Sequence, residues 1–175
     1  MSLSFWNFSI DVYRAPAVQE ECLAVQEQFG LDVNLVLLCA YLGAERSIDL
    51  TADDVAAAQR LVGQWHEDVV RTLRAARRNL KTIDPGQDVA DAASELRTKV
   101  KAAELEAERI EQAMLESWAD ARLAGRPRAE PGDAVRANLQ TLLAACGIGP
   151  ERLTVAKAMR HIIAAALAVG NGRND

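Results

Sequence analysis

Apolar residues recur along most of this chain at spacings of three and four, which is the period of an α-helix. Runs that alternate apolar and polar residues, as strands do, are missing, and good helix formers such as alanine, leucine and glutamate dominate. The pattern therefore predicts an all-α fold, a single-domain helical bundle of about six to seven helices over residues 1–175.

Glycine, proline and capping residues divide the first part of the chain. We expect a short helix over residues 4–13 and a second over 16–30, with its proline in the first turn and its glycine at the end. Asp32 can cap a third helix over 33–42, which ends at Gly43. Because this third segment is almost continuously apolar, we expect it to be buried on most sides.

The next helix is expected over residues 52–81. Thr51 and Asp54 have the spacing of a capping box at its start, and Gly63 either divides it into two pieces or bends it. A turn at residues 84–86, Asp-Pro-Gly, separates it from the next helix along the chain.

A long helix is then predicted over about residues 90–123. Its apolar residues are spaced as a heptad seam, namely Leu96, Val100, Ala103, Ala107, Ile110 and Met114, and Trp118 extends the same face. The alanines in the seam leave room for a neighbouring helix, either in the same domain or in a second copy of the chain. Beyond it we expect a linker-like loop (124–134), two further helices (133–146 and 151–169) and a frayed tail (170–175).

Two of these helices carry opposite charge stripes. Basic residues at helical spacing line one of them (Arg71, Arg74, Arg78 and Lys81), and acidic residues line the other (Glu104, Glu108 and Glu111). A tight turn between residues 80 and 90 would place five pairs side by side: Arg78 and Asp91, Arg74 and Glu95, Arg71 and Lys99, Glu104 and His66, and Glu111 and Arg60. The two stripes would then be offset along the hairpin. Each stripe would either be solvated and ion-paired, or form a face that binds a partner or a ligand.

The charge balance narrows the class of partner. The net charge is −5 and the isoelectric point is about 5.1, which argues against a general nucleic-acid binder. The amino terminus lacks the basic start of a secretory signal, and no apolar run approaches the roughly 20 residues of a membrane span. Three cysteines, Cys22, Cys39 and Cys146, have no metal-binding spacing. We therefore expect a cytoplasmic protein, with buried free thiols and no contact with nucleic acid or membrane.

Aromatic residues gather at the amino terminus. In a helix, Phe5 and Phe8 share one face, while Trp6 and Tyr13 lie on the other side. A short helix that is aromatic on two sides either fills the core of its own domain or docks on a partner.

A polar set near the middle of the charged hairpin has the residue types of a metal or acid–base site: His66, Glu67, Glu104 and Glu108. Its spacing is wrong for carboxylate-bridged helical metal sites, which use Glu-x-x-His. The chain has only two histidines, and the second, His161, is expected to be structural. Nucleotide-binding, hydrolase and zinc-protease signatures are missing, so we predict no metal ligand, no cofactor and no catalytic residue.

Several separated segments resemble a bacterial family of unknown function whose members open with Phe-Trp-x-Phe-Ser. They are residues 5–13 (FWNFSIDVY), 30–38 (GLDVNLVLL), 69–81 (VVRTLRAARRNLK) and 100–109 (VKAAELEAER). The resemblance runs over about residues 4–115. It implies one bacterial, helical, cytoplasmic domain, and it carries over no activity, cofactor or site residue.

Two functions are compatible with these patterns. The first is a non-enzymatic protein-interaction or regulatory module that binds another protein or a second copy of itself, through the Arg71, Arg74 and Arg78 face or the aromatic residues Phe5, Trp6 and Tyr13. The alternative is a small-ligand- or metal-binding enzyme with a pocket between helices 60–81 and 90–123. Four residues would line that pocket: Trp65, His66, Glu104 and Glu108.

Overall fold

The computed structural model describes residues 3–149 and 155–172, and every regular element within them is helical. In chain order the elements are α1 (Phe5–Tyr13), α2 (Val18–Phe29), α3 (Val33–Ala44), α4 (Ala52–Trp65), the π-helical segment η1 (His66–Val70), α5 (Arg71–Thr82), the 3-10 turn η2 (Gln87–Val89), α6 (Ala90–Arg122), α7 (Pro131–Ala145), α8 (Val155–Ala158) and α9 (Arg160–Asn171). The predicted all-α fold with one long helix is confirmed.

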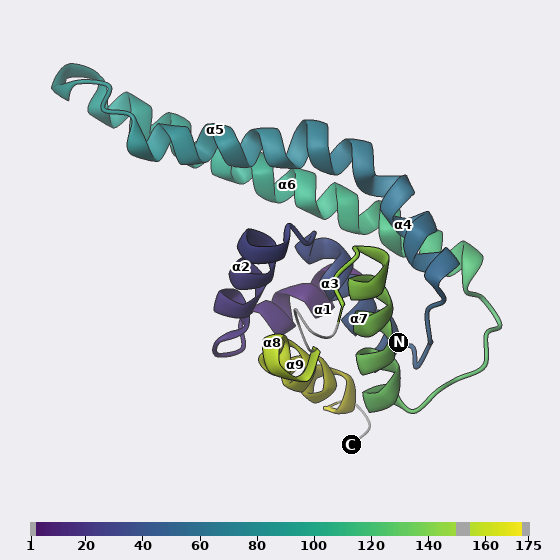
Figure 1. Ribbon diagram of the computed structural model, residues 1–175. Helices are drawn as coiled ribbons and strands as arrows, with labels where there is room; N and C mark the ends of the chain where they lie inside the picture. Colours follow the sequence, from purple (N-terminus) through teal and green to yellow (C-terminus); the bar gives the residue numbers. More distant parts are fainter. Residues whose placement is uncertain (1–2, 150–154, 173–175) are drawn as a thin grey trace.

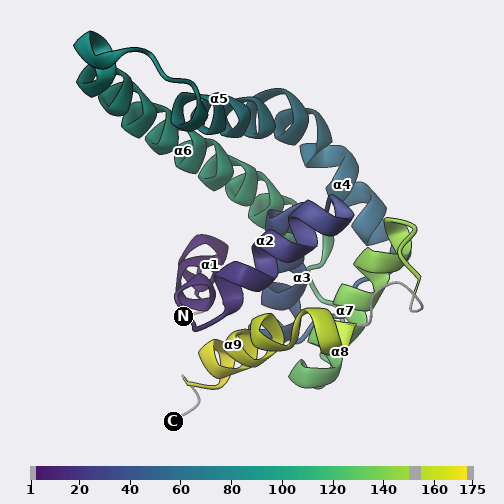
Figure 2. The same ribbon diagram turned by 60° about the vertical axis from the view of Figure 1, so that its left-hand side comes forward.

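The molecule consists of a bundle and a long hairpin (Figure 1). The bundle holds α1, α2, α3, α7, α8 and α9. In the hairpin, α4, η1 and α5 follow one another as a single rod that packs against α6. One end of the hairpin lies on the bundle, and the other end projects away from it (Figure 2). We call residues 71–103, which include the projecting part, the arm; none of its residues is buried.

The third helix is the centre of the bundle. α3 contacts α1, α2, α6, α7 and α9, and every residue from 34 to 44 is buried, as its apolar sequence predicts. Gly43 does not end this helix, which continues to Ala44. The glycine serves packing instead, because a side chain at this position would collide with α7.

Capping residues begin the helices largely where the sequence predicts. Asp32 accepts a hydrogen bond from the backbone of Asn34 at the start of α3, and Thr51 opens α4 with a reciprocal capping box. The start of α2 differs from the prediction. The helix begins at Val18, and the proline at position 16 belongs to the preceding turn, in which Ala17 has a left-handed backbone with φ of 64°.

The hairpin has a different register from the one that a tight turn would give. Arg74 donates to Glu104 and Glu108, whereas the expected neighbour was Glu95. Figure 2 shows the reason: the connection after α5 runs outward beyond the end of that helix before α6 begins. An extended residue advances roughly 3.3 Å and a helical one about 1.5 Å, so α6 needs more than twice as many residues to return.

The predicted heptad seam of α6 is only partly buried. Ala107 is buried, but Leu96 and Ile110 are 50% and 41% exposed. Only the second half of α6 reaches the bundle, and α5 offers no buried side chain to the first half. The buried positions of α6 therefore follow the bundle rather than the heptad: Glu104, Ala107, Glu111, Gln112, Leu115 and Ala119.

The last part of the chain is close to the prediction. The loop after α6 ends at α7, which has a proline in its first turn. α9 continues to Asn171, so helix replaces the first residues of the expected frayed tail; residues 173–175 lie outside the described part of the chain. The predicted start of the last helix at 151 also lies outside it. None of the described helices has both the length and the apolar character needed to cross a membrane.

Candidate functional site

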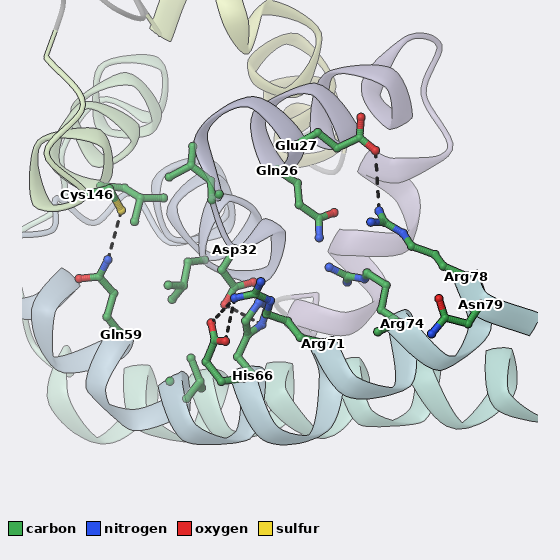
Figure 3. Close-up of a pocket in the computed structure, with 18 residues that line it drawn as sticks. Gln26, Glu27, Asp32, Gln59, His66, Arg71, Arg74, Arg78, Asn79 and Cys146 are labelled. Carbon is green, nitrogen blue, oxygen red and sulfur yellow. Dashed lines mark hydrogen bonds and ion pairs between the residues drawn. The ribbon is translucent and has the colours of Figure 1, made fainter. Parts of the chain in front are cut away.

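A polar cleft of about 740 Å³ lies between the corner that joins α2 to α3 and the rod of α4, η1 and α5. Figure 3 shows its labelled side chains, with Gln26 and Glu27 on one side and Arg71 on the other. Asp32 and His66 form its floor, with 12% and 14% of their side chains exposed. The predicted pocket between residues 60–81 and 90–123 is therefore misplaced, because those helices pack on each other and the cleft opens toward α2 and α3.

The π-helical segment η1 begins at His66 and sets the direction in which the side chain of His66 points. The backbone of Arg71 donates to the carbonyl of His66, so one turn of the rod is wider than an α-helical turn. Such a turn inserts an extra residue into a helix, and π segments are frequent at functional sites. The ring of His66 lies between two carboxylates, those of Asp32 and Glu111.

The two carboxylates come from different helices and face the same ring nitrogen. Asp32 caps α3: its Oδ1 accepts from the backbone of Asn34 at 2.8 Å, and its Oδ2 lies 3.4 Å from Nδ1 of His66. Glu111 comes from the middle of α6, and its Oε2 lies 3.2 Å from the same Nδ1. The side chain of Glu111 is fully buried, and its Oε1 has no hydrogen-bond partner within the described residues.

We call Asp32, His66 and Glu111 the acid–base cluster. Burial and neighbouring charges shift the pKa values of Asp32 and His66. Burial raises the pKa of Asp32 to about 8, and the nearby charge of Glu111 acts in the same direction. For His66, burial opposes the charged form, but the hydrogen bond to Glu111 and the charge of Asp32 outweigh it and raise the pKa. The cluster can therefore exchange a proton near neutral pH or hold a cation in its place.

The predicted arginine face is not a free basic stripe. Arg71 pairs with Glu67 one turn earlier, and Arg78 lies 3.7 Å from Glu27 of α2; all four side chains are more than half exposed. The expected neighbours of these arginines, Lys99 and Asp91, do not pair with them. Exposed pairs of this kind contribute little to stability, so both guanidinium groups remain available at the mouth of the cleft.

Arg74 is tied to the long helix. It is 14% exposed, and its guanidinium donates to Glu104 at 3.1 Å and to Glu108 at 2.6 Å. Arg77 also donates to Glu104. Burial would raise the pKa of Glu104, but the hydrogen bonds from Arg77 and Arg74 outweigh it and lower the pKa. This network joins α5 to α6 at the base of the arm.

The polar set of His66, Glu67, Glu104 and Glu108, which has the residue types of a metal or acid–base site, does not come together around His66. Glu104 and Glu108 face Arg74, and Glu67 is exposed beside Arg71. His66 meets Asp32, which sequence reasoning treated only as a helix cap, and Glu111, which was expected near Arg60. The sequence did hold one indication of this pairing. Asp32 directly precedes the apolar helix expected to be buried, and Glu111 lies next to the apolar seam of the long helix.

A second, mostly apolar pocket of about 330 Å³ lies between α1, the start of α3 and α6; we call it the aromatic pocket. Trp6 and Tyr13 line it, together with Leu105. Ser9 and Gln112 also line it, and each has a buried oxygen, Oγ and Oε1 respectively, without a hydrogen-bond partner within the described residues.

The polar cleft and the aromatic pocket adjoin. Gln26, Asp32 and Arg74 line both of them, so these three side chains form the partition between the two spaces. Arg74 approaches the partition from the rod, and Gln26 approaches it from α2 (Figure 3). A bound molecule that fills the aromatic pocket would therefore touch the acid–base cluster through Asp32.

The other candidate aromatic residues pack within the bundle or fix one helix to another. Phe5 is fully buried, and its ring stacks on Tyr41 of α3 with 5.2 Å between centroids. Phe8 meets the same ring edge-on. Trp65 donates from Nε1 to the carbonyl of Ala107 at 3.0 Å, which fixes the rod to α6.

The remaining titratable candidates lie away from the cluster or are inert. His161 binds Glu21, with 2.8 Å between its Nδ1 and a carboxylate oxygen, in agreement with a structural role. All three cysteines are free; Cys22 and Cys39 are buried, while Cys146 is exposed at the cleft. The expectation of buried thiols thus holds for two of the three.

Comparison with known proteins gives a family and no activity. A family model described as "Protein of unknown function (DUF2390)" matches residues 4–115. No curated protein and no solved structure matches the chain. The matched region contains Asp32, His66 and Glu111, and also the aromatic pocket.

Proposed function

The chain belongs to this family of proteins of unknown function. From the geometry of the site, we propose that the protein binds a small apolar molecule carrying a hydrogen-bond donor. The ligand occupies the aromatic pocket, and its polar end points to the partition shared with the polar cleft. The sequence also predicts a ligand-binding alternative, with its pocket between helices 60–81 and 90–123. The pocket proposed here lies instead between α1, the start of α3 and α6.

The observation that carries the proposal is the composition of the aromatic pocket. Small-molecule sites are concave, mostly apolar and supplied with a few convergent polar groups, in volumes of about 300–1,000 Å³. Here Trp6, Tyr13 and Leu105 supply apolar walls, and Ser9 and Gln112 supply buried polar atoms that have no hydrogen-bond partner in the part of the chain that the structure describes. Since a buried polar group without a partner costs about 1–3 kcal/mol, a ligand that satisfies these atoms gains affinity.

The available polar atoms define the ligand's chemistry. Oε1 of Gln112 is an amide oxygen and can only accept a hydrogen bond, and the bond from Nε2 of the same side chain to Asn34 at 2.8 Å fixes the orientation of the amide. The carboxylate of Glu108 is a second acceptor at the pocket. An amine or hydroxyl group on an aromatic or branched aliphatic body matches these acceptors.

The test uses 1-aminoanthracene, an aromatic amine whose fluorescence rises in apolar surroundings. We expect one saturable site on the wild-type protein and about fivefold weaker binding in Ser9→Ala, the loss of roughly one hydrogen bond. Ser94→Ala, a serine in the arm, is the matched control and should bind as the wild type does.

The stability of the variant separates binding from folding. Ser9→Ala removes a buried hydroxyl that has no partner among the described residues, so the variant should unfold at the same or a higher temperature than the wild type. Unsaturable probe binding, or equal affinity in wild type and Ser9→Ala, would reject the aromatic pocket as the binding site.

A second candidate function is the protein interaction of the sequence analysis, now assigned to the arm. The observation that favours it is the exposure of large apolar side chains near the tip of the arm, where Ile83, Val89 and Leu96 are 66%, 50% and 50% exposed. The proposed partner is a second copy of the chain. Light scattering should then give a dimer for the wild type and a monomer for the double variant Ile83→Ser, Leu96→Ser; a monomeric wild type rejects it.

We also propose that the protein works in the bacterial cytoplasm. Its three free thiols support a reducing compartment. A fluorescent fusion expressed in its own host should fill the cell interior, and a signal confined to the envelope would contradict this location.

A further inference from the structure

We propose that Asp32, His66 and Glu111 form a binding site for one divalent transition-metal ion. The three side chains come from the cap of α3, the start of η1 and the middle of α6, and one ligand atom from each lies within 4.8 Å of the other two. The inference goes beyond the proposed small-molecule binding and does not depend on it.

Two of the three distances between the ligand atoms, those from His66, fit the edges of a coordination polyhedron. With metal–ligand bonds of about 2.1 Å, neighbouring ligand atoms are about 3.0 Å apart in an octahedron and about 3.4 Å apart in a tetrahedron. Nδ1 of His66 lies 3.2 Å from Oε2 of Glu111 and 3.4 Å from Oδ2 of Asp32. Charge-assisted hydrogen bonds are shorter, at about 2.7–2.9 Å, so these contacts are long for a histidine that shares a proton with two carboxylates.

The fully buried side chain of Glu111 is an independent indication. It is 0% exposed, and one of its carboxylate oxygens has no hydrogen-bond partner within the described residues. One ring N–H shared between Asp32 and Glu111 leaves each of these bonds weaker than a single linear one, and the nearby Arg74 is already bound to two other carboxylates. When Asp32 and Glu111 are both ionised they carry two negative charges against at most one positive charge on His66, and a divalent ion would balance them and bind the unpaired oxygen.

Neighbouring groups already hold the ligand atoms in place. The backbone of Asn34 fixes Oδ1 of Asp32, which turns Oδ2 to the ring, and Asn34 itself is held by Gln112. Such outer contacts orient metal ligands and raise their affinity. Because Asp32 and His66 also line the polar cleft, water or a substrate can reach the ion at its remaining positions.

The donor set selects the class of metal. Two carboxylates and one imidazole suit Zn²⁺, Mn²⁺, Fe²⁺ or Co²⁺, while the imidazole disfavours Mg²⁺ and Ca²⁺. Three protein ligands with solvent access resemble catalytic rather than structural metal sites, which are closed by four protein ligands.

Co²⁺ is the probe for the test, because its visible absorption reports the ligands directly. The full chain is stripped with a chelator and titrated with Co²⁺ alone. We expect one equivalent to bind with a Kd of about 10 µM or below, and the affinity to fall roughly a hundredfold or more in Glu111→Gln.

The matched control is Glu104→Gln, a buried carboxylate two turns earlier on the same helix that is bound to arginines; it should keep wild-type affinity for Co²⁺. Cys146→Ser should also keep it. Glu111→Gln removes an incompletely paired buried charge, so without metal it should remain folded, as circular dichroism checks. Absence of stoichiometric binding to the wild type, equal affinity in Glu111→Gln, or loss in Cys146→Ser would overturn the site. Binding of 1-aminoanthracene is measured separately, so failure of either proposal is visible by itself.

Discussion

Gly43 of α3 and Val135 of α7 touch through their backbones. A Cβ atom on Gly43 would lie 2.5 Å from the backbone nitrogen of Val135, closer than any side chain can approach. Since α3 is the centre of the bundle, this contact sets how close α7 lies to the core. Neither helix can shift without disturbing the packing on the other side of α3.

The first prediction concerns that contact. Gly43→Ala should lower the free energy of unfolding by about 3 kcal/mol, the cost of inserting a methyl group into a filled core. Gly63→Ala is the matched control: it also lies in a helix, but nothing is within 4 Å of the added Cβ. It should raise stability by about 0.5–1 kcal/mol. Chemical denaturation measures both, and equal effects would show that the contact between α3 and α7 is looser than described.

The second prediction concerns acid stability. Asp54 is fully buried; burial opposes its ionisation, but hydrogen bonds from Arg126, Thr51 and Arg122 outweigh it and hold the pKa well below the usual range. The unfolded chain binds a proton at Asp54 near pH 4 and the folded chain does not, so the contribution to stability is complete above about pH 5 and is lost as the pH falls.

Asp54→Asn removes this contribution. It should lower the free energy of unfolding by about 3 kcal/mol at pH 7 and make stability less dependent on pH between about 5 and 3. Urea denaturation at several pH values measures both quantities. If wild type and variant lose stability in parallel on acidification, the pH dependence of the free energy of unfolding comes from other carboxylates.

The third prediction concerns thiol reactivity. Burial raises the pKa of Cys22 and of Cys39 to about 12, so neither forms a thiolate at pH 8. Partial burial raises the pKa of Cys146 as well, but this residue is exposed to the reagent, so it should be the first thiol of the native protein to react with Ellman's reagent. All three should react in denaturant. Fast reaction of two or more native thiols would indicate that the bundle opens around α2 or α3.

The fourth prediction concerns the arm. Because none of residues 71–103 is buried, their amides should exchange with deuterium at least about a hundredfold faster than those of α3. Glu104→Gln weakens the network with Arg74 and Arg77 and should speed exchange further in α5. Equal protection of arm and bundle in the isolated protein would show that a second copy of the chain covers the arm.

The candidate site was only partly visible in the sequence. His66, Arg74, Trp6 and Tyr13 do line the two cavities, so residue type alone located part of the polar and aromatic walls. Glu111 was assigned to a position beside Arg60, because the path of the loop between α5 and α6 was unknown.

The amino-acid pattern by itself determined the helices. Period, caps and the turn residues around them are local properties, and they located α1, α3, the rod of α4, η1 and α5, α6 and α7 to within a few residues. The burial of α3 followed from its continuous apolar run, and the capping box of α4 followed from side chains that bond within one turn.

Only the tertiary structure decided which helices meet. The extended connection before α6 sets the register of the hairpin, and the π-helical turn at His66 sets the direction of that ring. Asp32, His66 and Glu111 are brought together by these two features, from three elements far apart in the sequence. Helical period relates residues within one helix, whereas the pairing of residues between helices depends on the path of the connecting chain.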